Sequence, residues 1–127
     1  MRPETKHWLK ISDSDFDTSL YLFKGAKHPQ AVYFICQSIE KLLKAAIIEF
    51  TNKTPLKIHR LENLAKESKI RFSQNQLLEL TELSKHYSRV RYPDISQESY
   101  NTKAKIKPII ESGKELYQWT RKKFINQ

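Results

Sequence analysis

Residues 31–50 read AVYFICQSIEKLLKAAIIEF, and this stretch decides the fold class. Its apolar side chains recur every three or four positions, which is the period of a helix that buries one side. The apolar positions are Ala31, Phe34, Ile35, Ile39, Leu42, Leu43, Ala46, Ile47 and Phe50. An apolar stripe this wide is buried only if other helices pack against much of the helix surface. We therefore expect residues 30–50 to form the central helix of a bundle.

The helical period continues on both sides of this stretch. It predicts further helices over about residues 4–24, 60–68 and 73–88, and from about 102 to the end of the apolar pattern at Phe124. The chain holds only two glycines, whereas an all-β fold needs more of them in its turns. Short connections favour antiparallel neighbours. We predict one all-α domain over residues 1–127, an up-and-down bundle of about five helices.

Local signals mark several of the expected helix ends. Gly25 is suited to end the first helix, because glycine is common as a C-terminal cap. Ser73 and Gln76 fit a capping box at the start of the fourth helix. Thr102 fits the N-cap of the fifth.

Two prolines should interrupt the helical pattern. Pro93 disfavours the helical conformation at Tyr92, so we expect the chain to turn there. Pro108 lies inside the fifth pattern and should kink that helix or delay its start.

Composition indicates a protein of the cytoplasm. The longest apolar run, AVYFIC, is far shorter than the roughly 18 residues that a membrane span needs, and the first residues lack the apolar core of a secretory signal. The single cysteine, Cys36, lies in the apolar central helix. We interpret it as a small core residue in a reducing compartment.

Positive charge is concentrated in the second part of the chain. The formal net charge is +9; residues 1–50 carry 7 Lys/Arg against 6 Asp/Glu, and residues 51–127 carry 16 against 8. A basic surface attracts polyanions, and nucleic acid is the common case. General solubility is the alternative interpretation.

The motifs of cofactor and metal enzymes are missing from the sequence. It contains no HExxH pattern, no cluster of cysteine and histidine, and no glycine loop of the GxGxxG or Walker type. We expect neither a metal nor a cofactor.

Polar residues border the apolar stripe of the central helix. Gln37, Glu40 and Lys44 follow one another at helical spacing along one edge. They form either the solvent face of that helix or one wall of a groove.

The segment YSRVRYPD, residues 87–94, is the second candidate. Arg89 and Arg91 suit bidentate contact with phosphate, while Tyr87 and Tyr92 offer stacking surfaces for a base. The alternative is structural. Cations complement the dipole at the end of the fourth helix, and Arg91 pairs with Glu40 or with Asp94 to fix the turn.

Three ordered motifs carry a family resemblance. CQSIEKLLKAAI, IHRLENL with His59, and YSRVRYPD resemble segments of the HEPN domain, the higher eukaryotes and prokaryotes nucleotide-binding domain. The resemblance spans roughly residues 5–124. It implies a five-helix, largely up-and-down bundle that is commonly a homodimer and often works with a small nucleotidyltransferase in toxin–antitoxin modules. It also implies a nucleotide- or phosphate-binding role for the residues of the three motifs: Gln37, Glu40, Lys44, His59, Tyr87, Arg89, Arg91, Tyr92 and Asp94.

Many members of this family are metal-independent ribonucleases that share an Arg-x4–6-His motif near the end of the fourth helix. This chain lacks that spacing there, because no arginine precedes His86 at the required distance. Residual catalysis would have to rely on a divergent set such as His86, Arg89 and Arg91.

The leading hypothesis is a HEPN-type nucleotide- or RNA-binding module that partners a nucleotidyltransferase. The alternatives are a divergent ribonuclease and a module that binds only protein. We also predict a homodimer, because several aromatic side chains look exposed in the helical patterns. These are Trp8, Phe16, Phe72 and Trp119.

Overall fold

The computed structural model describes residues 1–55, 57 and 60–125, and the regular elements in these ranges are all helical. The helices are α1 (Pro3–Lys24), α2 (His28–Thr51), α3 (Leu61–Glu67), α4 (Gln74–Arg89), α5 (Pro93–Ser99), α6 (Lys103–Arg121) and the 3₁₀ helix η1 (Lys122–Phe124). The predicted all-α class is confirmed.

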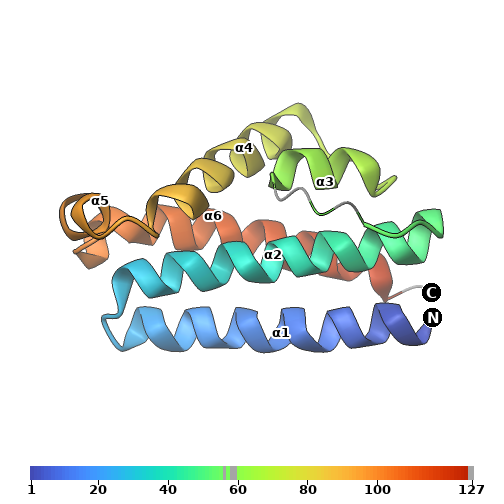
Figure 1. Cartoon of the computed structure of the whole chain (residues 1–127), viewed down its shortest axis with the longest axis horizontal. Coiled ribbons are helices and arrows are strands. Elements are labelled where there is room, and N and C mark those ends of the chain that lie inside the picture. The colour runs from blue at the N-terminus through green and yellow to red at the C-terminus, as the bar shows by residue number, and fades with distance from the viewer. Residues whose placement is uncertain (56, 58–59, 126–127) are drawn as a thin grey trace.

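The long helices form an up-and-down bundle (Figure 1). α1 and α2 lie antiparallel side by side, α6 runs behind α2, and α3 and α4 lie on the side of α2 away from α1. α2 contacts α1, α3, α4 and α6, so it is the central helix that the sequence predicts.

α2 buries more of its surface than the predicted stripe. Val32, Cys36, Ala45 and Ile48 are buried in addition to the aliphatic positions of that stripe. Neighbours on several sides of α2 account for the extra burial. Cys36 is a core residue as expected, and burial raises the pKa of its thiol well above the usual range.

Most of the predicted helix ends are confirmed. Ser73 and Gln76 form a reciprocal capping box, and the hydroxyl of Thr102 accepts a hydrogen bond from the backbone N–H of Lys105 at 3.2 Å. Gly25 is the C-cap of α1, but its φ is −82°, and the left-handed residue of this turn is Ala26 with a φ of 60°.

The predictions for the two prolines are confirmed in part. The chain turns at Tyr92 as expected, but Pro93 then opens the additional short helix α5. Proline is tolerated there because the first N–H groups of a helix have no intrahelical acceptor. Pro108 lies inside α6 without delaying its start, which follows directly after Thr102.

The aromatic residues that motivated the predicted dimer are largely engaged within the chain. Phe16 stacks on Tyr117 with ring centroids 4.2 Å apart, and Phe72 packs against Trp119 at 5.3 Å. Trp8 packs against the core. The homodimer stays a prediction, but these side chains no longer argue for it.

Among the residues that the structure describes, no helix combines the length and apolar character needed to cross a membrane.

The closest approach of α6 to α2 depends on Gly113. A Cβ atom at this position would lie 2.6 Å from Cγ1 of Ile35, far inside the contact distance of two carbon atoms. The buried glycine therefore lets the two helices pack at their observed separation.

We predict that Gly113→Ala lowers the free energy of unfolding by about 1–3 kcal/mol, because overpacking at Ile35 outweighs the roughly 1 kcal/mol gain in helix propensity. Urea unfolding measures this change. Gly25→Ala is the matched control, since its added Cβ meets no atom closer than 3.4 Å. The double variant Gly113→Ala/Ile35→Ala should lose less free energy of unfolding than the sum of the losses in the two single variants. An additive double variant would contradict the steric explanation.

Candidate functional site

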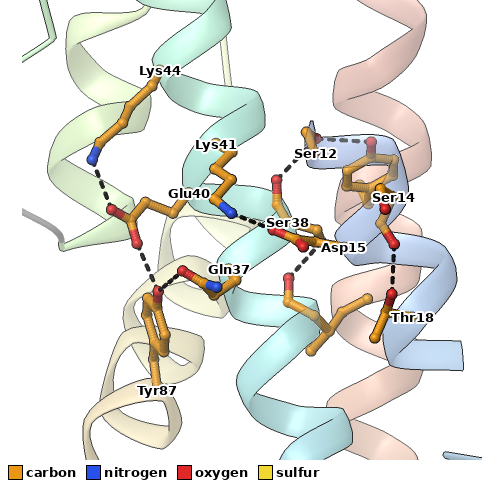
Figure 2. Close-up of polar contacts among 12 residues, drawn as sticks. Ser12, Ser14, Asp15, Thr18, Gln37, Ser38, Glu40, Lys41, Lys44 and Tyr87 are labelled. Atoms are coloured by element: carbon orange, nitrogen blue, oxygen red, sulfur yellow. Dashed lines mark hydrogen bonds and ion pairs between the residues drawn. The ribbon is translucent and has the colours of Figure 1, made fainter. Parts of the chain in front are cut away.

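A buried carboxylate joins α2 to α4 at the centre of the candidate site. The hydroxyl of Tyr87 donates to Oε1 of Glu40 at 2.7 Å and lies 3.3 Å from Oε1 of Gln37. Nζ of Lys44 donates to Oε2 of Glu40 at 2.8 Å. Figure 2 shows Gln37, Glu40 and Lys44 along one side of α2, with Tyr87 reaching them from α4. The predicted polar edge of the central helix therefore faces another helix.

Burial explains why these contacts are needed. Glu40 is 8% exposed and Tyr87 is 4% exposed. A carboxylate removed from water must keep hydrogen-bond partners, or the desolvation cost is not recovered. Burial raises the pKa of Tyr87 well above its usual range, and the hydrogen bond to Glu40 adds to this shift. The phenol therefore remains a proton donor to Glu40.

Arg91 lies over the outer side of this network. Its guanidinium carbon is 4.7 Å from the ring centroid of Tyr87 and 5.6 Å from that of Tyr33. Within the described ranges Arg91 forms no ion pair with Glu40 or Asp94, so the structural pairing expected from the sequence is not formed. The arginine is held by aromatic faces and keeps its hydrogen-bond donors available.

A cleft of about 380 Å³ opens beside Tyr87, and we call it the basic cleft. Its lining consists of Arg60, Ser84, Lys85, Tyr87, Ser88, Arg89 and Arg91. Four of these side chains are cationic and none is a carboxylate. The cleft lies between the start of α3 and the last two turns of α4.

Ser84 fixes the two walls of the basic cleft relative to each other. Its Oγ accepts the backbone N–H of Leu61 at 2.8 Å and donates to Oε1 of Glu62 at 2.9 Å. The same carboxylate lies 3.8 Å from Nη1 of Arg60. Arg60 is thereby placed in the same lining as Arg89 and Arg91.

The structure divides the predicted site residues into separate groups. Gln37, Glu40, Lys44 and Tyr87 form the internal network, while Arg89 and Arg91 line the basic cleft. Tyr92 is 56% exposed and Asp94 is exposed at the start of α5; neither is among the lining residues of the cleft. His59 lies outside the described residues.

Sequence analysis missed two cations of the basic cleft. Lys85 precedes Arg89 by four positions, a helical spacing that puts both side chains on one face of α4 and that offered a usable signal. Arg60 offered no such signal, because only the packing of α3 on α4 brings it to the cleft.

His86 lines a different cleft from Arg89 and Arg91. Its Nδ1 lies 2.8 Å from the hydroxyl of Tyr100, and the ring lines a separate cleft between α4 and α6. Burial lowers the pKa of His86, which favours the neutral imidazole. His86 is absent from the lining of the basic cleft that Arg89 and Arg91 share, so the divergent catalytic set of these three residues does not line one cleft, although the charge of Arg89 acts on His86.

A larger cleft of about 550 Å³ lies at the start of α1 and the end of α2, with Arg2, Trp8, Lys44 and Lys53 in its lining. Its cations are partly engaged by the protein. Arg2 contacts Asn52 and Glu49, and Lys44 contacts Glu40. We therefore regard the basic cleft as the stronger anion site.

The family profile described as "HEPN domain" matches residues 5–123. This chain belongs to the HEPN family. The resemblance seen in the sequence motifs is thereby confirmed over nearly the whole chain. A search of curated proteins found no match to this chain.

Two solved structures share the fold of this HEPN domain. TT1696 from Thermus thermophilus superposes with a TM-score of 0.82 at 14% identity, covering 97% of this chain and all of the other. ST0689, an archaeal HEPN homologue, gives a TM-score of 0.73 at 20% identity, covering 97% of this chain and 98% of the other. At these identities the likeness concerns the fold alone.

We predict that Tyr87→Phe destabilises the HEPN domain by about 1.5–3 kcal/mol, because it removes a hydrogen bond to a buried carboxylate. The aromatic ring beneath Arg91 is retained, so the substitution isolates the hydroxyl. Denaturant unfolding provides the measurement, with Tyr21→Phe as the control because Tyr21 is 78% exposed on α1. Equal stability of the two variants would show that the Tyr87 hydroxyl contributes nothing to the α2–α4 contact.

Proposed function

We propose that this HEPN domain is a nucleotide- or RNA-binding module and that the basic cleft holds the phosphate groups of its ligand. The observation that carries this proposal is the convergence of four cations on one cleft, from the N-cap of α3, the last turns of α4 and the segment after α4, with no carboxylate among the described lining residues. Arginine predominates among them, and its planar guanidinium suits bidentate contact with phosphate oxygens.

Two of the four cations are the most available for a ligand. Lys85 contacts Glu82 at 3.1 Å and Arg60 lies near Glu62, whereas Arg89 and Arg91 form no ion pair with a carboxylate in the described part of the chain. Ser84 and Ser88 add hydroxyl groups to the same lining. A phosphate in the cleft would therefore first meet the two arginines at the end of α4.

The proposed partners follow from the family and not from a described contact. Prokaryotic relatives often act with a small nucleotidyltransferase in toxin–antitoxin-like systems, and we propose the same setting and a homodimer for this chain. Multi-angle light scattering of the purified protein, alone and with a nucleotidyltransferase encoded beside it, tests both proposals. A monomer at micromolar concentration that gains no mass with that partner would contradict them.

We expect Arg89→Ala to weaken RNA binding by about 1.5–3 kcal/mol, since it removes a charge-assisted contact inside the basic cleft. Fluorescence anisotropy with a labelled RNA oligonucleotide measures the affinity, and competition with free nucleotides shows whether a mononucleotide suffices. Arg71→Ala removes the same charge from an exposed position outside the cleft, and Lys122→Ala removes one from η1. Both should change only the salt dependence slightly.

Arg91→Ala tests the cleft less specifically than Arg89→Ala does. The guanidinium of Arg91 also packs on Tyr87 and Tyr33, so its removal can change stability as well as binding. Thermal melts must accompany every binding curve. If Arg89→Ala binds like the parent while Arg71→Ala or Lys122→Ala does not, positive charge acts as a diffuse surface property and the basic cleft is not the site.

We predict no ribonuclease activity above background in EDTA. Metal-independent cleavage requires a base and a cation around the same phosphate. His86 and Arg91 line different clefts, so they do not meet this requirement together. Incubation with single-stranded and structured RNA measures the activity. Cleavage that disappears in both His86→Ala and Arg89→Ala would overturn the prediction and support the divergent ribonuclease instead.

A further inference from the structure

Arg91 forms a wall shared by two neighbouring cavities. One is the basic cleft; the other, of about 280 Å³, lies between the start of α2 and the segment that leads into α5. We call the second cavity the aromatic pocket, with Gln30, Tyr33, Phe34, Arg91 and Ser96 among its lining residues. The rings of Tyr33 and Tyr87, one from each cavity, lie 5.5 Å apart beneath the same guanidinium.

The two cavities differ in chemistry. The basic cleft offers cations and hydroxyl groups, whereas the aromatic pocket offers ring surfaces together with an amide and a hydroxyl. Tyr33 and Phe34 meet edge to face, with centroids 5.6 Å apart and an interplanar angle of 85°. The two rings therefore stand nearly perpendicular.

Packing in the core does not account for an aromatic side chain at position 34. Phe34 belongs to the apolar stripe of α2, yet it is half-buried and lies outside the hydrophobic core cluster that contains its neighbours Ile35 and Ile39. Its surface is therefore partly available to a ligand. Gln30 is exposed one helical turn earlier and can both donate and accept hydrogen bonds.

We propose that the aromatic pocket binds one unpaired base of a single-stranded RNA whose phosphate lies in the basic cleft. This inference rests on the proposed function and specifies its substrate. The pocket volume of about 280 Å³ lies just below the range of small-ligand sites, which begins at about 300 Å³, so the pocket offers room for a single base and not for a longer segment. Arg91 stands between the two subsites and contacts both parts of the nucleotide.

The strand preference follows from the position of the pocket. Bases in a duplex are stacked and paired, so they do not enter a side pocket lined by aromatic rings, whereas unpaired bases stack on such rings. Gln30 and Ser96 belong to the same lining. The hydroxyl of Ser96 donates to the carbonyl oxygen of Pro93 at 3.3 Å and keeps its lone pairs for the base, while the amide of Gln30 can donate and accept.

The test compares single-stranded and duplex RNA of equal length by anisotropy, using parent protein, Phe34→Leu and Tyr21→Leu. Phe34→Leu keeps apolar bulk and helix propensity but removes the ring; Tyr21→Leu makes the same type of change on an exposed part of α1. We expect the parent to prefer the single strand, and Phe34→Leu to lose about 5- to 140-fold in affinity for it. Binding to duplex RNA should remain unchanged in both variants.

A 2-aminopurine placed in the single strand reports stacking directly. Its fluorescence should be quenched by the parent and by Tyr21→Leu, and not by Phe34→Leu. Equal affinity of the parent for single strand and duplex, or parent-like behaviour of Phe34→Leu, would overturn the inference while leaving the basic cleft as the site. A parent protein that binds neither RNA would overturn the inference, and one that also binds no free nucleotide would refute the proposed function as well.

Discussion

The buried carboxylate of Glu40 is the constraint on which the site depends. It lies on the central helix where α4 crosses, and it is held by the hydroxyl of Tyr87 and the ammonium of Lys44. Because a carboxylate without partners is costly in an apolar interior, any rotation or sliding of α4 that removed Tyr87 would be opposed. The register of α4 on α2 is therefore set by a polar contact as well as by the apolar core.

That register determines where the arginines stand. Tyr87 points inward, so Arg89, two positions later on the same helix, faces the opposite side, and Arg91 follows beyond the helix end over the outer face of the Tyr87 ring. Within residues 87–91, the side chain that points inward and those that point outward therefore have different roles. The tyrosine joins two helices, and the arginines are presented to solvent in a cleft without acidic lining.

The same division explains how a fold can be kept while its surface chemistry changes. TT1696 and ST0689 share the architecture at 14% and 20% identity. The core requires apolar side chains of suitable volume and a few fixed features, such as a small residue at Gly113 where α6 approaches Ile35. The cations of the basic cleft lie outside that core, so the ligand chemistry of this chain has to be established from its own residues.

The sequence by itself determined the helices other than α5 and most of their caps. The stripe of residues 31–50 lies within one helix, and the Ser73–Gln76 capping box and the Thr102 cap each lie within one turn. All three are local signals, and each is confirmed. The motifs also identified Gln37, Glu40 and Tyr87 as members of one candidate site. Their spacing, however, left open whether they faced solvent or a groove. The ligand role that the family resemblance implies for them stays a prediction.

Only the tertiary structure decided which of these residues face inward. Glu40 on α2 and Tyr87 on α4 form a hydrogen bond although they are forty-seven positions apart in the sequence. No local pattern encodes such a pairing. The same holds for Arg60, which reaches the basic cleft through the packing of α3, and for Arg91, which rests on aromatic rings instead of pairing with Asp94. Helix periodicity fixes the direction of a side chain relative to its own axis. The groups that it meets depend on how the helices cross, which is set by the packing of the whole core.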